Sequence, residues 1–168
     1  MTDWATFATA EPAFANRVRA ILTSTTNCVL GTIRADGSPR LSGIDPFFVE
    51  DVLYLGSMEG ARKAADLHRD PRMSLHAVPW ESRLRRDGAA DPGDVDAKLT
   101  GLAIPIVNEL QQSLVIAALA AERGFDPPAG GDLFAIDLTS AVTISVEDDH
   151  LVVDRWTPGD GRVTIRRT

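Results

Sequence analysis

Two adjacent cations, Arg62 and Lys63, stand where a short helical pattern begins between two strand-like runs. Peptide N–H groups at the start of a helix attract anions, a guanidinium can bind a phosphate through two parallel hydrogen bonds, and an ammonium adds a point charge. The positive end of the helix dipole repels cations there, and a bound phosphate would remove that conflict. The pair therefore predicts a phosphate site. The alternative is that both side chains extend into solvent or pair with Glu59 and Asp66.

The other residues that could do chemistry are scattered along the chain. His150 follows three acidic residues, which suggests either a metal cluster or a charged hairpin turn, and the spacing favours the turn because it fits no common ligand pattern. His68 is expected on the exposed side of the short helix. The sequence contains no glycine-rich dinucleotide fingerprint, phosphate loop, zinc-protease motif, Cys-x-x-Cys pair or nucleophile elbow. It therefore names no metal ligand and no catalytic residue.

The elements that must position these residues are short strands with a few helices. Apolar residues at helical spacing predict helices over 11–25, 59–70 and 108–125, with Asn108 as an N-cap and Gly124 as a C-terminal stop. Strands are expected over 28–34, 41–49, 50–57, 73–78, 95–106, 133–139, 141–146 and 151–157, followed by an arm over 161–168. The polar segment 81–94 is expected to be a loop. This count predicts an antiparallel barrel with helical insertions.

Two local signals refine the strand prediction. Asp36 and Gly37 predict a tight hairpin turn after the first strand. Pro46 lacks the N–H group that a central strand would need, so the second strand is expected at an edge or at a bulge.

Composition limits the class of protein. A chain of 168 residues with 44% hydrophobic and 24% charged residues predicts one globular domain over 1–168. The net charge of −7 argues against a broad nucleic-acid-binding face. The start of the chain lacks a charged region followed by an apolar one, and no apolar run reaches membrane-spanning length, so a cytoplasmic protein without membrane contact is expected. Cys28 lies in an apolar run and is expected to be a buried thiol.

Four segments together resemble one known family. Residues 61–72 read ARKAADLHRDPR, residues 28–44 form the hairpin CVLGTIRADGSPRLSGI, residues 96–106 read DAKLTGLAIPI, and residues 156–167 read WTPGDGRVTIRR. They resemble the pyridoxamine 5′-phosphate oxidase superfamily of flavin-binding split barrels, whose helix segment reads S-R-K-x-x-x-L-x-x-N-P. Asp70 stands here in place of the asparagine.

The resemblance implies a mainly β, α+β fold: an antiparallel six-stranded split β-barrel with flanking helices. It also implies a homodimer that binds two flavins at its interface, with FMN held through its phosphate and the tail reaching the flavin from the partner subunit. The residues implied to bind the cofactor are Arg40, Leu41, Ser42, Ser57, Arg62, Lys63, Trp156 and Arg166, and the residue implied to bind substrate is Arg162. For Trp156 the alternative is a strand aromatic packed in the core or in the dimer interface.

The tail departs from that of the vitamin B6 oxidases. An arginine and a histidine of the oxidase tail contact the pyridine substrate, and they align here with Arg162 and Thr164, so the histidine is missing. Asp96 stands about where a flavin-facing glutamine is expected. The expected function is therefore hydride transfer between FMN and another small conjugated substrate. The alternatives are a reductase that uses the deazaflavin coenzyme (F-420) and a non-catalytic flavin- or haem-binding protein on the same barrel.

Overall fold

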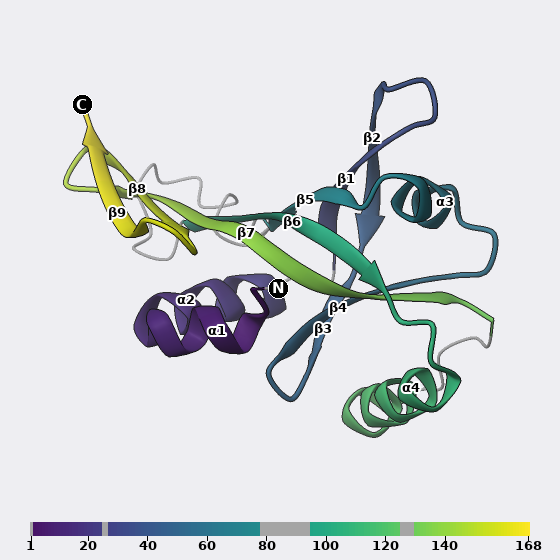
Figure 1. Ribbon diagram of the computed structural model, residues 1–168. Coiled ribbons are helices and arrows are strands. Elements are labelled where there is room, and N and C mark those ends of the chain that lie inside the picture. The colour runs from purple at the N-terminus through teal and green to yellow at the C-terminus, as the bar shows by residue number, and fades with distance from the viewer. Residues whose placement is uncertain (1, 25–26, 78–94, 125–129) are drawn as a thin grey trace.

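The computed structural model describes residues 2–24, 27–77, 95–124 and 130–168. Within these ranges the chain forms four helices and nine strands (Figure 1). The helices are α1 (Trp4–Ala10), α2 (Pro12–Thr23), α3 (Arg62–Arg69) and α4 (Glu109–Arg123). The strands are β1 (Cys28–Ile33), β2 (Pro39–Ile44), β3 (Pro46–Val49), β4 (Val52–Ser57), β5 (Arg72–Ala77), β6 (Val95–Pro105), β7 (Asp132–Glu147), β8 (His150–Thr157) and β9 (Gly161–Arg167).

All strand pairs in the sheet are antiparallel, in the order β2-β1-β5-β6-β7-β4-β3. One edge of β7 pairs with β6, and the other edge is shared between β4, which pairs at residues 132–135, and β8, which pairs at residues 141–147. The second half of β7 therefore leaves the barrel with β8 and β9 as an arm, which Figure 1 shows on the side away from α3. The sheet does not close, and the predicted antiparallel split barrel with flanking helices is confirmed.

Three element predictions need correction. Residues 133–139 and 141–146 belong to the single strand β7, because a register shift opposite Thr100 and Gly101 lets β6 follow it without a break. Gly101 permits this close approach, since a Cβ there would lie 2.3 Å from the carbonyl oxygen of Asp137. Residues 41–49 divide between β2 and β3 rather than forming one strand. Helix α1, which Asp3 caps, was not predicted.

The predictions for turns, helix ends and the proline position agree with the structure. Gly37 has a φ of +83°, and Asp36 accepts a 2.9 Å hydrogen bond from the Ser38 N–H, so the predicted hairpin turn is confirmed. Pro46 lies in β3 at the end of the sheet order, as predicted for a residue without an N–H. Asn108 caps α4, and Gly124 ends it in the left-handed region. The segment 81–94 lies outside the described residues.

Two hydrophobic clusters hold the helices to the sheet. The larger one contains Trp4 and Phe7 of α1, Phe14 of α2 and Trp156 of β8, so α1 and α2 cover the inner face of the arm (Figure 1). The smaller cluster lies under α4 and consists of Phe47, Tyr54, Ile106, Val115, Leu119 and Leu133. Among the described helices, none combines the length and the apolar character needed to cross a membrane.

Candidate functional site

Helix α3 is joined to strand β2 by two cations of the predicted site. Lys63 donates from Nζ to the carbonyl oxygen of Gly43 at 2.7 Å. Arg40 donates from Nε to Oδ2 of Asp66 at 2.5 Å. Strand β2 is the end strand of the order, so its second backbone edge pairs with no other described strand. The fold thus places Arg40 and Lys63 together where the start of α3 meets an open strand edge.

Asp66 is the buried acceptor that organises this corner. The residue is only 3% exposed, and its carboxylate also accepts from Thr32 Oγ1 at 2.9 Å and from Arg69 Nη2 at 3.3 Å. The hydrogen bond from Arg40 lowers the pKa of Asp66, although burial acts in the opposite direction. The carboxylate is therefore ionised at neutral pH and holds the Arg40 guanidinium by its Nε edge.

Arg62 and Lys63 differ in their surroundings. Lys63 is half-buried, and burial lowers the pKa of its ammonium group. Arg62 is exposed, and its side chain makes no hydrogen bond or ion pair with any residue in the part of the chain that the structure describes. Asp66 pairs with Arg40 and Arg69, so the part of the alternative in which Asp66 pairs with Arg62 or Lys63 is wrong. Arg62 does extend into solvent, as the same alternative expected.

The first turn of α3 also lacks its usual acceptors. Ala61 occupies the N-cap position and offers no side-chain hydrogen bond, and the turn contains no acidic residue. The N-terminal N–H groups of a helix need a partner from a cap, from water or from a ligand. An anion near Arg62 and Lys63 would satisfy both the peptide groups and the side-chain charges.

The remaining predicted residues of this region lie on neighbouring elements. Arg40 and Ser42 share one face of β2 because side chains alternate along a strand, whereas Leu41 points to the other face and is 75% exposed. Leu41 could therefore serve a cofactor on the Arg40 face only through its backbone. Ser57 ends β4, and its Oγ donates a 3.2 Å hydrogen bond to the carbonyl of Met58.

The predicted tail residues lie elsewhere in the protomer. Trp156 is 2% exposed and packs on Phe7, with ring centroids 4.4 Å apart. The Nε of Arg162 lies 3.9 Å from Glu11 Oε2, and Arg166 donates to Glu147 Oε2 at 3.3 Å. Figure 1 shows β8 and β9 at the opposite end of the sheet from α3. One protomer does not bring these three residues to Arg62 and Lys63, so their implied contacts with cofactor or substrate stay predictions that require a second subunit.

Sequence reasoning missed two contacts that position α3. Asp66 follows Lys63 by three residues and precedes the buried Leu67, so helical spacing indicated a carboxylate near the buried face, but not its partner on β2. His68 is exposed as predicted, yet its Nε2 lies 2.6 Å from Oδ1 of Asp132 at the start of β7. The histidine ring also packs on Phe134, with centroids 5.1 Å apart.

The comparisons with known proteins agree with this architecture. The family model of pyridoxamine 5′-phosphate oxidase matches residues 14–124, and no curated protein matches the chain. A haem-binding protein from Mycobacterium smegmatis aligns with a TM-score of 0.61 at 19% identity, covering 84% of this chain and 56% of that chain. This chain thus spans little more than half the length of that protein.

Two further solved structures are similar over most of their length. PhzG from Burkholderia lata 383, in complex with tetrahydrophenazine-1-carboxylic acid, has a TM-score of 0.57 at 13% identity and covers 100% of this chain and 93% of its own. The haem storage protein HutZ from Vibrio cholerae has a TM-score of 0.55 at 18% identity, covering 77% and 89%. At such identities these structures show a shared fold, and the family match covers well over half of the sequence. The chain therefore belongs to the pyridoxamine 5′-phosphate oxidase family.

Proposed function

We propose that the chain binds FMN and acts as a flavin-dependent oxidoreductase on a small conjugated substrate. The observation that carries this proposal is that Arg40 and Lys63, held by Asp66 and Gly43, lie near the start of α3, which no side chain caps. Arg62, whose side chain has no partner among the described residues, lies beside them. A phosphate monoester carries a charge of about −1.5 to −2 at neutral pH and accepts hydrogen bonds on three oxygens, which suits such a cluster.

The donors at this corner fit a phosphate. An ammonium group has three N–H donors, and Lys63 uses one of them on Gly43. A guanidinium has five donors, and Asp66 engages the Nε of Arg40. The remaining donors of these two residues, together with Arg62 and Ser57, would hold the phosphate, and the open edge of β2 offers backbone groups to the ring. Bound FMN would supply the hydride chemistry, while the protein binds and orients it and excludes water.

A second copy of the chain is part of the proposal. The face of the arm that α1 and α2 leave open carries four exposed apolar side chains, Val146 (46% exposed), Leu151 (39%), Val163 (41%) and Ile165 (39%). The exposed cations Arg155 and Arg167 lie among them. A two-fold symmetric dimer would bury this face in both copies. Arg162 and Arg166 point to the other face of β9 from Val163 and Ile165, so burial of this face does not by itself carry them to the partner's cofactor.

Pyridoxamine phosphate is not the substrate that the tail favours. Thr164 stands at the position of the substrate histidine, and its side chain is shorter than an imidazole. Its hydroxyl already donates a hydrogen bond to Asp154, so it is not available to a substrate. Loss of a polar partner built for a substrate can reduce discrimination by about 10⁴. The oxidation of another conjugated ring is therefore the better proposal.

Haem binding is the second candidate. His150 contacts the carbonyl oxygen of Asp148 through Nδ1 at 2.7 Å, an arrangement that leaves Nε2 as the potential iron ligand. This second candidate is also supported by the similar folds of the M. smegmatis haem-binding protein and of the haem storage protein HutZ. The deazaflavin coenzyme is a further alternative to FMN, because it could use the same phosphate site.

Absorption spectroscopy of the purified protein tests the proposal. Titration with FMN should produce a saturable change in the flavin bands, and titration with the deazaflavin coenzyme or with haemin provides the comparison. A Soret band that appears stoichiometrically with haemin, without any response to FMN, would favour the second candidate. Saturable binding of the deazaflavin coenzyme without any binding of FMN would support the phosphate site, but the proposed cofactor would then be the deazaflavin coenzyme.

A further inference from the structure

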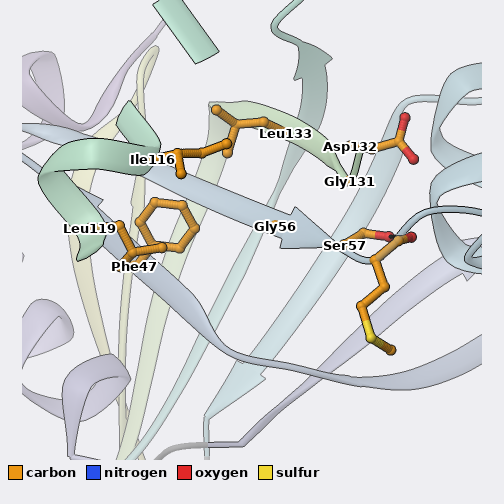
Figure 2. A pocket seen from close by; sticks show the side chains of 9 residues that line it. Phe47, Gly56, Ser57, Ile116, Leu119, Gly131, Asp132 and Leu133 are labelled. Carbon is orange, nitrogen blue, oxygen red and sulfur yellow. Dashed lines mark hydrogen bonds between the residues drawn. The ribbon is translucent and has the colours of Figure 1, made fainter. Parts of the chain in front are cut away.

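Helix α4 packs on the sheet through one of its faces. Val115 and Leu119 of this face are buried in the smaller hydrophobic cluster. Figure 2 shows Leu119 beside Phe47 and Ile116 beside Leu133, where these four side chains line a cavity of about 200 Å³ between the helix and the sheet. The inner face of α4 is therefore the face that carries Val115, Ile116 and Leu119.

The opposite face of α4 is apolar as well. Every residue from 114 to 121 is apolar, so the apolar surface continues around the helix. Leu110 is 70% exposed and Leu114 is 63% exposed. Figure 1 shows α4 at the edge of the molecule, with the sheet on one side of it. Helices that are apolar all round are normally buried on all sides, so the outer face is expected to have a partner.

The exposed apolar residues of this face follow a regular spacing. Leu110, Leu114, Ala117 and Ala121 are separated by four, three and four residues, which is the spacing with which one helix packs along another. All four residues are exposed, and we call them the outer stripe of α4. The spacing therefore favours a second helix as the partner.

The outer stripe is complementary to itself in an antiparallel arrangement. A two-fold axis that crosses α4 midway between residues 115 and 116 brings Leu114 opposite the partner's Ala117. The same axis brings Leu110 opposite the partner's Ala121. Each large side chain thus meets a small one, which lets the two helices interdigitate in close contact. A parallel arrangement in register would instead set leucine against leucine and alanine against alanine.

The ends of α4 agree with the antiparallel arrangement. Val107, which lies just before the helix and is 84% exposed, comes opposite the partner's Gly124, which ends the helix. Antiparallel helices also bring the positive N-terminal end of one dipole toward the negative C-terminal end of the other. Residue size and helix polarity therefore favour the same geometry.

The charges beside the outer stripe argue against a lipid surface as the partner. Helices that lie on membranes carry lysine and arginine beside their apolar face. The charged residues of α4 are Glu109, Glu122 and Arg123, and Arg123 pairs with Asp45 on the inner side. The outer stripe itself contains no charge, so a second stripe can cover it without burying one.

We propose that the outer stripe is a contact between two copies of the chain, in which two α4 helices pack antiparallel about a two-fold axis. The contact is separate from the arm face that carries Val163 and Ile165, and it goes beyond the proposed flavin function. Helix α4 has 15 residues and is about 22 Å long, so the contact buries less area than stable dimers, whose interfaces start at about 1,200 Å². It should therefore form at submillimolar rather than micromolar protein concentration.

The double variant Val163→Glu/Ile165→Glu, in which the arm face is blocked, isolates the α4 contact. Sedimentation of this variant from micromolar to submillimolar concentration should show a reversible equilibrium between monomer and dimer. In the same background, Ala117→Leu should weaken dimerisation at least about tenfold, because a leucine then meets Leu114 of the other copy. Unspecific hydrophobic association would instead become stronger with the added leucine.

Exchange of the large and the small residue gives the decisive comparison. Leu114→Ala alone leaves a gap and should weaken dimerisation, whereas Leu114→Ala combined with Ala117→Leu should restore it, because a leucine again faces an alanine. Asn16→Leu adds a leucine to the exposed side of α2 and should leave the equilibrium unchanged. These positions are exposed, so the variants should fold, which circular dichroism checks.

Three results would overturn the proposal. They are a chain that stays monomeric at submillimolar concentration, dimerisation that Ala117→Leu strengthens, and dimerisation that the exchange of residues 114 and 117 fails to restore. The measurement involves no flavin, so failure of FMN to bind would leave the α4 contact standing.

Discussion

Arg40 and Asp66, 26 residues apart in the chain, meet through a 2.5 Å hydrogen bond that joins β2 to α3. The Asp66 carboxylate is 4% exposed, whereas the Arg40 side chain is 18% exposed. The buried carboxylate therefore holds the Arg40 guanidinium in place close to the protein surface. The same helix begins with Arg62 and Lys63. The ion pair therefore sets the distance between the strand edge and the start of the helix, on which the proposed phosphate site depends.

Replacement of both Arg62 and Lys63 by alanine should weaken FMN binding strongly without unfolding the protein. Each charge-assisted hydrogen bond contributes about 1.5–3 kcal/mol, which corresponds to about tenfold or more in affinity for each residue. Fluorescence titration measures the affinity, and circular dichroism checks the fold. Arg72→Ala removes an exposed cation just beyond the same helix and serves as the control. Equal affinity for FMN in the double variant and in the control would contradict the proposed phosphate site.

The affinity for FMN should decrease at alkaline pH because of Lys63. Burial lowers the pKa of this ammonium group, so it loses its proton at a lower pH than the ordinary value of about 10.4. The phosphate is held best by the charged form, and its affinity should fall as pH rises through that lowered pKa. Lys63→Arg keeps its charge over the whole range and should lack this decrease. Parallel pH profiles of the two proteins would show that Lys63 does not contact the phosphate.

Asp66→Asn should destabilise the fold, because it leaves Arg40 beside a neutral side chain. Removal of one partner of a buried ion pair costs about 3–5 kcal/mol of the free energy of unfolding. Asp70→Asn changes an acid at the end of the same helix whose partner Arg72 is 67% exposed, and its effect should be clearly smaller. Urea denaturation of both variants gives the comparison, and equal losses would contradict a special role for Asp66.

The contribution of Asp66 also depends on pH. Its pKa is lowered in the folded chain by the hydrogen bond from Arg40, so the unfolded chain binds the proton more readily. The contribution is complete above the unfolded value of about 3.9 and is lost as pH falls through the folded value. Wild-type protein should therefore lose more stability than Asp66→Asn between neutral and acid pH. Identical acid profiles would speak against this assignment.

The apolar face of the arm should control assembly. Val163→Glu combined with Ile165→Glu places two charges on the face that the proposed dimer buries, so the variant should be a monomer at micromolar concentration by light scattering. Asn16→Glu adds a charge on the exposed side of α2 and should remain dimeric. A wild-type monomer under the same conditions would exclude the dimer and, with it, the cross-subunit roles of Arg162 and Arg166.

Sequence alone determined the features that local chemistry controls. The Asp36-Gly37 turn, the Asn108 cap and the Gly124 stop each depend on a few neighbouring residues, and the structure confirms them. The antiparallel split barrel followed from strand periodicity combined with the resemblance of four segments to one family, and it is confirmed as well. The cation pair at the start of α3 was also visible, because residue type and spacing suffice to indicate it.

Only the tertiary structure decided which partners these residues have. Nothing near Asp66 in the chain indicates Arg40, and nothing near Lys63 indicates Gly43, because strand pairing and helix packing bring those residues together from a distance. The same reason explains the single strand β7, whose continuity depends on a register shift against β6. Trp156 is a further example, because the sequence left both a cofactor contact implied by the resemblance and a place in the core open, and only the packing of α1 buries its ring against Phe7 within one subunit.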